Sequence, residues 1–176
     1  MRAILLTVVT LMLATPAHAF EPNVNDEMEL NVAQAILAIK RADPGIEAFF
    51  ENAAGYAVYP GVGKGGLVVG GAYGKGLVIV DEKVDGYTTM TQGTIGLQIG
   101  GQKYAQFIFF KDDVAIAHFR RGNFEFGAQA SAVAITAGAS ADASYDGGVA
   151  VFTHAAGGLM VEGSVGGQKF TYEPRK

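Results

Sequence analysis

Two glycine–lysine segments have the residue types and spacing that point to chemistry. The first is Gly61-Val62-Gly63-Lys64-Gly65-Gly66, and the second is Gly74-Lys75-Gly76. Glycine-rich backbone exposes N–H groups that form anion-binding concavities, and each lysine would add positive charge. The alternative is that these glycines only build tight turns and bulges, or let strands approach closely. The candidate contacts for a phosphate headgroup are Gly63, Lys64, Gly65, Gly66, Gly74, Lys75 and Gly76.

An arginine pair adds a second candidate contact. Arg120 and Arg121 end a short helix that is predicted to begin at Asp112-Asp113 and to be closed by Gly122. Its predicted apolar positions are Val114, Ile116, Ala117 and Phe119. Arginines suit the negative end of a helix dipole, which is a structural role. Their planar fork of donors also suits phosphate. We therefore add Arg120 and Arg121 to the lipid- or anion-binding candidates.

The sequence matches nucleotide, catalytic and metal motifs poorly. Residues 61–66 fit G-x-G-x-x-G formally, but the Leu67-Val68-Val69 run that follows predicts a strand where a helix is required. No serine lies in G-x-S-x-G, and neither His118 nor His154 has a partner at metal-ligand spacing. We predict no catalytic residues, no metal and no cofactor. A hydrolase that uses Asp112, Asp113 or His118 remains a third alternative.

The composition describes a compact, glycine-rich domain. The chain has 176 residues with 25 glycines, no cysteine and no tryptophan, and 49% of it is hydrophobic. This excludes a disordered chain, a disulfide scaffold and a thiolate metal site. A net charge of −4 argues against a nucleic-acid partner.

Residues 1–19 have the pattern of a secretory signal. Arg2 precedes an apolar run from Ile4 to Leu13, and Ala17-His18-Ala19 is an A-x-A cleavage site. We expect cleavage after Ala19, a single domain over residues 20–176, and a periplasmic or secreted location.

The periodicity of the remaining chain predicts an α+β fold. It favours a mostly antiparallel β sheet or small barrel-like core with two N-terminal helices and one inserted helix. The first helix begins at Asp26 after an Asn25 cap, and the second runs from Pro44 to Asn52. The three- and four-residue spacing of Met28, Val32, Ala35, Ile36 and Ile39 predicts one apolar face on the first helix. Asp85-Gly86 and Gly100-Gly101 are predicted turns. Strands are expected near 56–59, 66–73, 76–81, 87–91, 94–100, 104–110, 123–136, 148–153, 158–164 and 168–172, with a loop or weakly paired strand at 137–147.

Several ordered motifs resemble the SYLF domain family, which is also called the Las17-binding actin-regulator domain. The matching segments are residues 54–60, 64–71 and 73–76, followed by Phe109-Phe110-Lys111, residues 124–131 and residues 157–164. The resemblance spans roughly residues 30–166. It implies phospholipid binding, and actin association in some members.

The resemblance has one departure and leaves alternatives open. The family's basic N-terminal segment is here acidic, with Asp26, Glu27 and Glu29. Actin binding is not expected of an exported protein. The leading hypothesis is a non-enzymatic phospholipid-binding protein of the bacterial cell envelope, with a phospholipid or membrane surface as its partner. The alternative is an outer-membrane β-barrel or a structural envelope protein.

Overall fold

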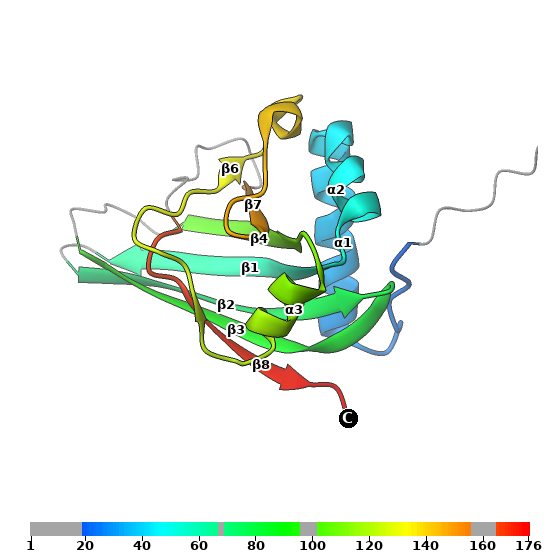
Figure 1. The fold of residues 1–176 in the computed structure, drawn as a ribbon, viewed down its shortest axis with the longest axis horizontal. Coiled ribbons are helices and arrows are strands. Elements are labelled where there is room, and N and C mark those ends of the chain that lie inside the picture. The colour runs from blue at the N-terminus through cyan, green and yellow to red at the C-terminus, as the bar shows by residue number, and fades with distance from the viewer. Residues whose placement is uncertain (1–18, 67–68, 96–101, 156–164) are drawn as a thin grey trace, which may run out of the picture.

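The computed structural model describes residues 19–66, 69–95, 102–155 and 165–176, and it has the predicted α+β class (Figure 1). In the described ranges, eight strands form one curled, half-barrel sheet in the order β5-β8-β3-β2-β1-β4-β7-β6. All neighbours are antiparallel except β6 and β7, which are parallel. The expected signal segment, the Gly100-Gly101 turn and the 158–164 strand fall outside the described residues, apart from Ala19. The elements are α1 (Glu27–Ala42), η1 (Pro44–Ile46), α2 (Glu47–Asn52), β1 (Gly55–Gly66), β2 (Val69–Val80), β3 (Lys83–Ile95), β4 (Gln102–Phe110), α3 (Asp113–Phe119), β5 (Phe124–Glu125), β6 (Val133–Ala134), η2 (Ala139–Asp142), β7 (Val149–His154) and β8 (Lys169–Pro174).

Helix α1 begins one residue later than the sequence indicates. Its cap is Asp26, whose carboxylate accepts from the N–H groups of Met28 at 2.9 Å and Glu29 at 3.1 Å. The predicted cap, Asn25, instead donates its own N–H to the side chain of Asn23. The predicted apolar face is confirmed, since Val32, Ala35, Ile36 and Ile39 are buried and Met28 packs against the same core.

The glycine segments lie inside long strands, which corrects the predicted breaks. β1, β2 and β3 are 12, 12 and 13 residues long and run through positions 60–65, 74–75 and 92–93. In residues 61–66 and 70–76, only Gly66 has a positive φ. Glycine has a weak strand propensity. Here it is overridden because β1 and β2 each lie between two strands that supply hydrogen-bond partners. The register shifts between Val58 and Gly61, where a bulge displaces the strand.

The turn between β2 and β3 is Asp81-Glu82, and not the predicted Asp85-Gly86. Asp81 and Glu82 have φ values of 49° and 59°. Gly86 lies within β3, where a Cβ would come 2.5 Å from the ring of Tyr172 and 2.6 Å from the carbonyl oxygen of Glu173. Gly86 is therefore needed for close strand approach, and not for a turn.

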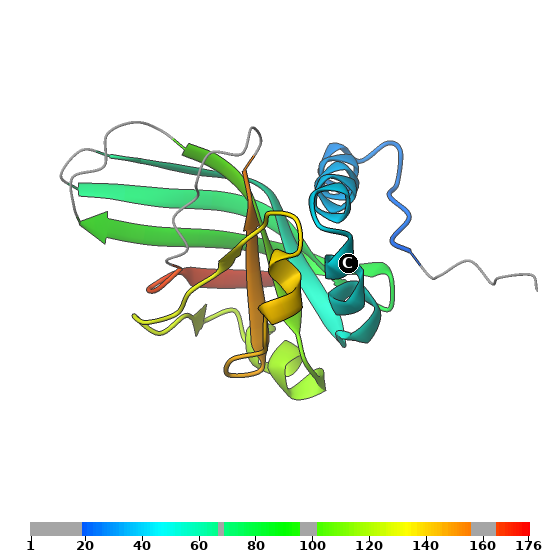
Figure 2. The same cartoon turned by 90° about the horizontal axis from the view of Figure 1, so that it is seen from above.

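The sheet separates two hydrophobic cores (Figures 1 and 2). Helices α1 and α2 pack on one face, with Tyr56, Val58 and Phe109 beneath them. Helix α3 and the segment around β5 cover the other face, where Ile108, Phe110 and Phe170 lie.

The inserted helix confirms its predicted ends but not all of its apolar face. Asp112 caps α3 through the N–H of Ala115 at 2.9 Å, and Gly122 follows the helix with a φ of 72°. Of the predicted apolar positions, Ile116 and Phe119 are buried, whereas Val114 is 77% exposed and Ala117 is exposed. Ala115 also packs against the core that contains Ile116 and Phe119, so the buried side of α3 is formed by these three residues. The long strand predicted over 123–136 is reduced to β5 and β6, because the intervening chain forms a turn in which the N–H of Ala130 donates to the carbonyl oxygen of Gly127 at 3.0 Å.

Asp43 ties the N-terminal helices to η2, which predicts a pH-dependent stability. Its side chain is buried and accepts from the N–H groups of Gly45 at 3.0 Å and Ser140 at 2.7 Å. Burial alone would raise the pKa of Asp43, but the donors of Ser140 and Gly45 outweigh it and hold this pKa below its ordinary value. The stabilisation is therefore complete well above the unfolded pKa and is lost as pH falls through that value toward the folded one.

We expect Asp43→Asn to destabilise the protein by about 1–3 kcal/mol at pH 7, because an amide NH₂ would face one of two buried N–H donors. Urea denaturation at pH 7 and pH 3 measures this cost. The difference from the wild type should shrink at pH 3, and a cost that is equal at both pH values would contradict the assignment.

Candidate functional site

Strand pairing places the two predicted lysines on opposite faces of the sheet. Lys75 is paired with Gly61, whereas Lys64 is paired with Ala72. Successive side chains along a strand alternate between the two faces of the sheet. Lys64 and its cross-strand partner Ala72 therefore lie on the face that α3 covers, and Lys75 and its partner Gly61 lie on the opposite face. Their exposure agrees, since Lys64 is buried and Lys75 is exposed. The structure therefore does not bring Lys64 and Lys75 into one anion-binding concavity.

The face that carries Lys75 is rich in glycine, and we call it the glycine face. Cβ atoms built on Gly63, Gly65 and Gly93 would meet nothing within 4 Å among the described residues. Figures 1 and 2 show the long strands extending beyond α1 and α2, so neither of these two helices covers this half of the sheet. The glycine face consists of Gly61, Gly63, Gly65, Gly71, Gly93, Tyr73, Lys75, Thr91, Lys103 and Lys169.

Lysines and one tyrosine provide the chemistry of the glycine face. Lys75, Lys103 and Lys169 come from three different strands and are all exposed. Lys103 is paired with Gly63 and extends over Gly61, where its Cε would lie 3.1 Å from a Cβ. Tyr73 is 50% exposed above the glycines. The Lys169 ammonium forms a long, exposed ion pair with the carboxylate of Glu125, at an N–O distance of 3.7 Å. The arrangement presents spaced positive charges and an amphipathic ring on a surface that an extended anionic partner can approach closely.

The other predicted glycines lie on the inner face of the sheet, which is the face that α3 covers. A Cβ on Gly74 would lie 2.9 Å from the side chain of Val62, and one on Gly76 would lie 2.3 Å from the carbonyl oxygen of Val58. Gly66 is paired with Gly70 on the same face as Lys64. Of the predicted glycines, only Gly63 and Gly65 lie on the glycine face.

A buried polar layer lies on the inner face. Gln106 and Gln168 exchange two hydrogen bonds at 2.7 Å and 3.1 Å, and Gln92 donates to the carbonyl oxygen of Gly166 at 2.9 Å. Tyr59 and Thr88 share a hydrogen bond at 2.8 Å. No pattern in the sequence predicts this layer, because its residues lie far apart in the chain and have no regular spacing.

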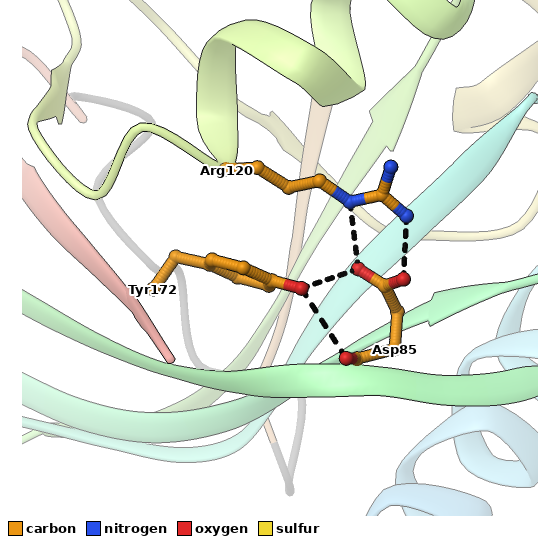
Figure 3. Close-up of polar contacts among 3 residues, drawn as sticks. All are labelled: Asp85, Arg120 and Tyr172. Carbon is orange, nitrogen blue, oxygen red and sulfur yellow. Dashed lines mark hydrogen bonds and ion pairs between the residues drawn. The ribbon is translucent and has the colours of Figure 1, made fainter. Parts of the chain in front are cut away.

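Arg120 has a structural partner, Asp85 (Figure 3), whereas Arg121 lies exposed beyond α3. The Arg120 guanidinium donates to Asp85 through Nε at 2.8 Å and pairs with its second oxygen through a terminal nitrogen. Tyr172 donates to the same carboxylate at 2.7 Å. Burial alone would raise the pKa of Asp85, but Arg120 and Tyr172 outweigh it and hold that pKa below its ordinary range. The cluster joins α3, β3 and β8, so the structure favours the structural role of Arg120.

Asp112, Asp113 and His118, the residues of the hydrolase alternative, each have a structural role or contact in α3. Asp112 caps α3 and Asp113 lies in its first turn. His118 packs against the ring of Phe124 at 5.2 Å. In the described ranges, no group of three or more histidine, cysteine or acidic residues lies together as metal ligands, and no helix is long and apolar enough to cross a membrane.

A curled sheet that leaves one basic face open has the form of a binding domain. Residues 91–175 match the Ysc84 family, described as "Las17-binding protein actin regulator". The chain is also 30% identical over 138 residues to Beta cell expansion factor A of Aeromonas veronii. This match covers 77% of this chain and 52% of that protein. The chain thus spans about half the length of this curated relative. The predicted resemblance to the Ysc84 or SYLF family is thus confirmed over residues 91–175, whereas the predicted segments 54–60, 64–71 and 73–76 lie outside the residues that the family model matches.

Proposed function

We propose that this protein is a non-enzymatic phospholipid-binding protein of the bacterial cell envelope. It lays its glycine face against the headgroups of an anionic lipid surface. The observation that carries the proposal is the open placement of Lys75, Lys103 and Lys169 around Tyr73. The protein has a net charge of −4, but its glycine face carries three exposed lysines. The protein would therefore approach an anionic surface with the glycine face first.

Each feature of the glycine face suits a lipid headgroup layer. A lysine near an anionic membrane surface contributes about 1 kcal/mol. Tyrosine rings are enriched at headgroup level because one end is apolar and the other polar. Gly63 and Gly65 have no side chain to hold headgroups away from the backbone. These properties support a peripheral contact that needs neither a deep pocket nor a catalytic group.

The predicted export supports lipid as the partner in preference to actin. The family description names actin regulation, but a chain released after Ala19 into the periplasm or medium would meet lipid surfaces and not actin filaments. We propose this location on the signal pattern of residues 1–19.

Co-sedimentation with phosphatidylglycerol-containing vesicles at low salt tests the proposal. We expect Lys75→Ala/Lys103→Ala to reduce partitioning about 30-fold, from two contributions of about 1 kcal/mol each. The matched control is Lys83→Ala/Lys111→Ala, which removes two exposed lysines outside the glycine face. Equal losses for the two double variants would show a net-charge effect and contradict the site. No binding of the wild type to anionic or neutral vesicles would contradict the function.

A further inference from the structure

A cavity lies at the end of the sheet opposite the glycine-rich ends of β1 and β2. It has a volume of about 520 Å³ and lies between the N-terminal segment, α1, α2, the start of β1 and the β2–β3 turn. Pockets for small molecules commonly measure about 300–1,000 Å³ and are lined mainly by apolar side chains. The cavity therefore has the size of a site for one small or single-chain molecule.

The walls of the cavity are apolar and partly aromatic. Ile36 and Leu37 of α1, Phe50 of α2, Tyr56 of β1 and Phe20 line it. Leu37 is 54% exposed although it lies beside these residues. The buried side of α1 does not account for Leu37, because that side consists of Val32, Ala35, Ile36 and Ile39. An apolar ligand in the cavity would cover it.

The charged groups of the cavity are mostly carboxylates. Its lining holds Glu47, Glu51, Glu82 and a single cation, Lys40. Lys40 pairs with Glu47 at 2.8 Å. Tyr56 donates to Glu82 at 3.3 Å, but neither Glu82 nor Glu51 has a cationic partner among the described residues. Two carboxylates are thus available beside an apolar wall.

The cavity wall already binds a cation over an aromatic ring. The Lys40 ammonium lies 4.5 Å from the centroid of the Phe50 ring. Such contacts are attractive because the ring face carries negative charge density. The face of Phe50 is thus already occupied by the Lys40 ammonium, whose charge is balanced by Glu47 at 2.8 Å, and a cationic ligand group would lie beside the other carboxylates of the lining.

Glu82 is held in an unfavourable backbone conformation at this site. Asp81 and Glu82 form a two-residue turn with φ values of 49° and 59°, where asparagine and glycine are strongly preferred. Strained non-glycine residues concentrate at functional sites. Keeping glutamate here maintains a carboxylate on the cavity, which glycine could not supply.

We propose that this cavity binds a single-chain amphiphile with a cationic head group. Its apolar body lies against Leu37, Phe50 and Tyr56, and its head is neutralised by Glu51 and Glu82. The site is separate from the glycine face and has the opposite charge preference, so the proposal stands independently of the lipid-surface function.

Isothermal titration calorimetry of the whole protein with three probes of equal chain length tests the proposal. The probes are decyltrimethylammonium, decyl maltoside and decyl sulfate, each below its micelle concentration. We expect the cation to bind most tightly and the sulfate most weakly. Glu51→Gln/Glu82→Gln should weaken binding of the cation about tenfold, as expected for two partly exposed ion pairs, and leave maltoside binding unchanged. The matched control Glu125→Gln/Glu173→Gln removes two exposed carboxylates outside the cavity lining and should change neither.

A second variant separates ligand binding from folding. Glu82→Gly places the preferred residue in the strained turn, so we expect a higher melting temperature together with weaker binding of the cation. The amide resonances of Leu37, Phe50 and Tyr56 should shift on titration. Tight binding of decyl sulfate, an unchanged affinity in the Glu51/Glu82 double variant, or shifts confined to the glycine face would each overturn the proposal.

Discussion

Gly76→Ala is expected to destabilise the protein by about 3 kcal/mol, because the added methyl group has no space in the sheet. A Cβ on Gly76 would lie 2.3 Å from the carbonyl oxygen of Val58 and 2.8 Å from the ring of Tyr59. Val58 and Tyr59 are both fully buried, and backbone atoms at such a distance cannot yield without disturbing the β1–β2 ladder. The midpoint of urea denaturation measures the cost.

The matched control for Gly76 is Gly63→Ala on the neighbouring strand. A Cβ on Gly63 meets nothing within 4 Å among the described residues, and its φ is not positive. Alanine there restricts the unfolded chain and should change stability by less than about 1 kcal/mol, in the stabilising direction. Similar losses for the two variants would contradict the division of the glycines between an inner structural face and an open outer face.

Phe109→Ala is expected to cost about 3–5 kcal/mol, the range for truncating a buried phenylalanine. Phe109 is fully buried on β4 beneath α2. Its ring lies 4.8 Å from that of Phe50, and 5.6 to 5.9 Å from those of Phe49, Tyr56 and Phe152. Because Phe50 and Tyr56 also line the cavity, the substitution should weaken binding of the cationic amphiphile as well as stability.

Val114→Ala is the control for the Phe109 prediction. Val114 is 77% exposed on α3, so its truncation should change the free energy of unfolding by no more than about 0.5 kcal/mol. Denaturation of both variants, followed by titration of the folded proteins, compares them. A small cost for Phe109→Ala would show that α2 is not anchored through this aromatic cluster.

Much of the fold follows from local sequence patterns. The apolar spacing from Met28 to Ile39 predicts the buried face of α1, and Asp112 and Gly122 mark the ends of α3. These signals are reliable because capping and helix periodicity depend on residues within one or two turns. The strand predicted near 104–110 is likewise confirmed within β4.

The errors occur where distant chain segments decide the outcome. The glycine-rich positions 60–65 and 74–75 are predicted breaks, yet these residues lie in continuous strands between paired neighbours. Asp85-Gly86 is a typical turn pair, but Gly86 is required by the close approach of Tyr172. The strand near 168–172 is predicted and corresponds to β8, but neither its pairing with β3 nor the pairing of β1 with β4 follows from the local sequence.

The sequence by itself determined the α+β class, the family resemblance and the residue types of a basic, glycine-rich surface. Only the tertiary structure decided which of those residues share a face. The register of β1 on β2, displaced by the bulge between Val58 and Gly61, sends Lys64 inward and Lys75 outward. Arg120 likewise pairs with Asp85, 35 positions away, because the tertiary structure brings the end of α3 beside the start of β3. The physical reason is that side-chain direction alternates along a strand, so a single-residue shift in pairing changes the face on which a side chain lies.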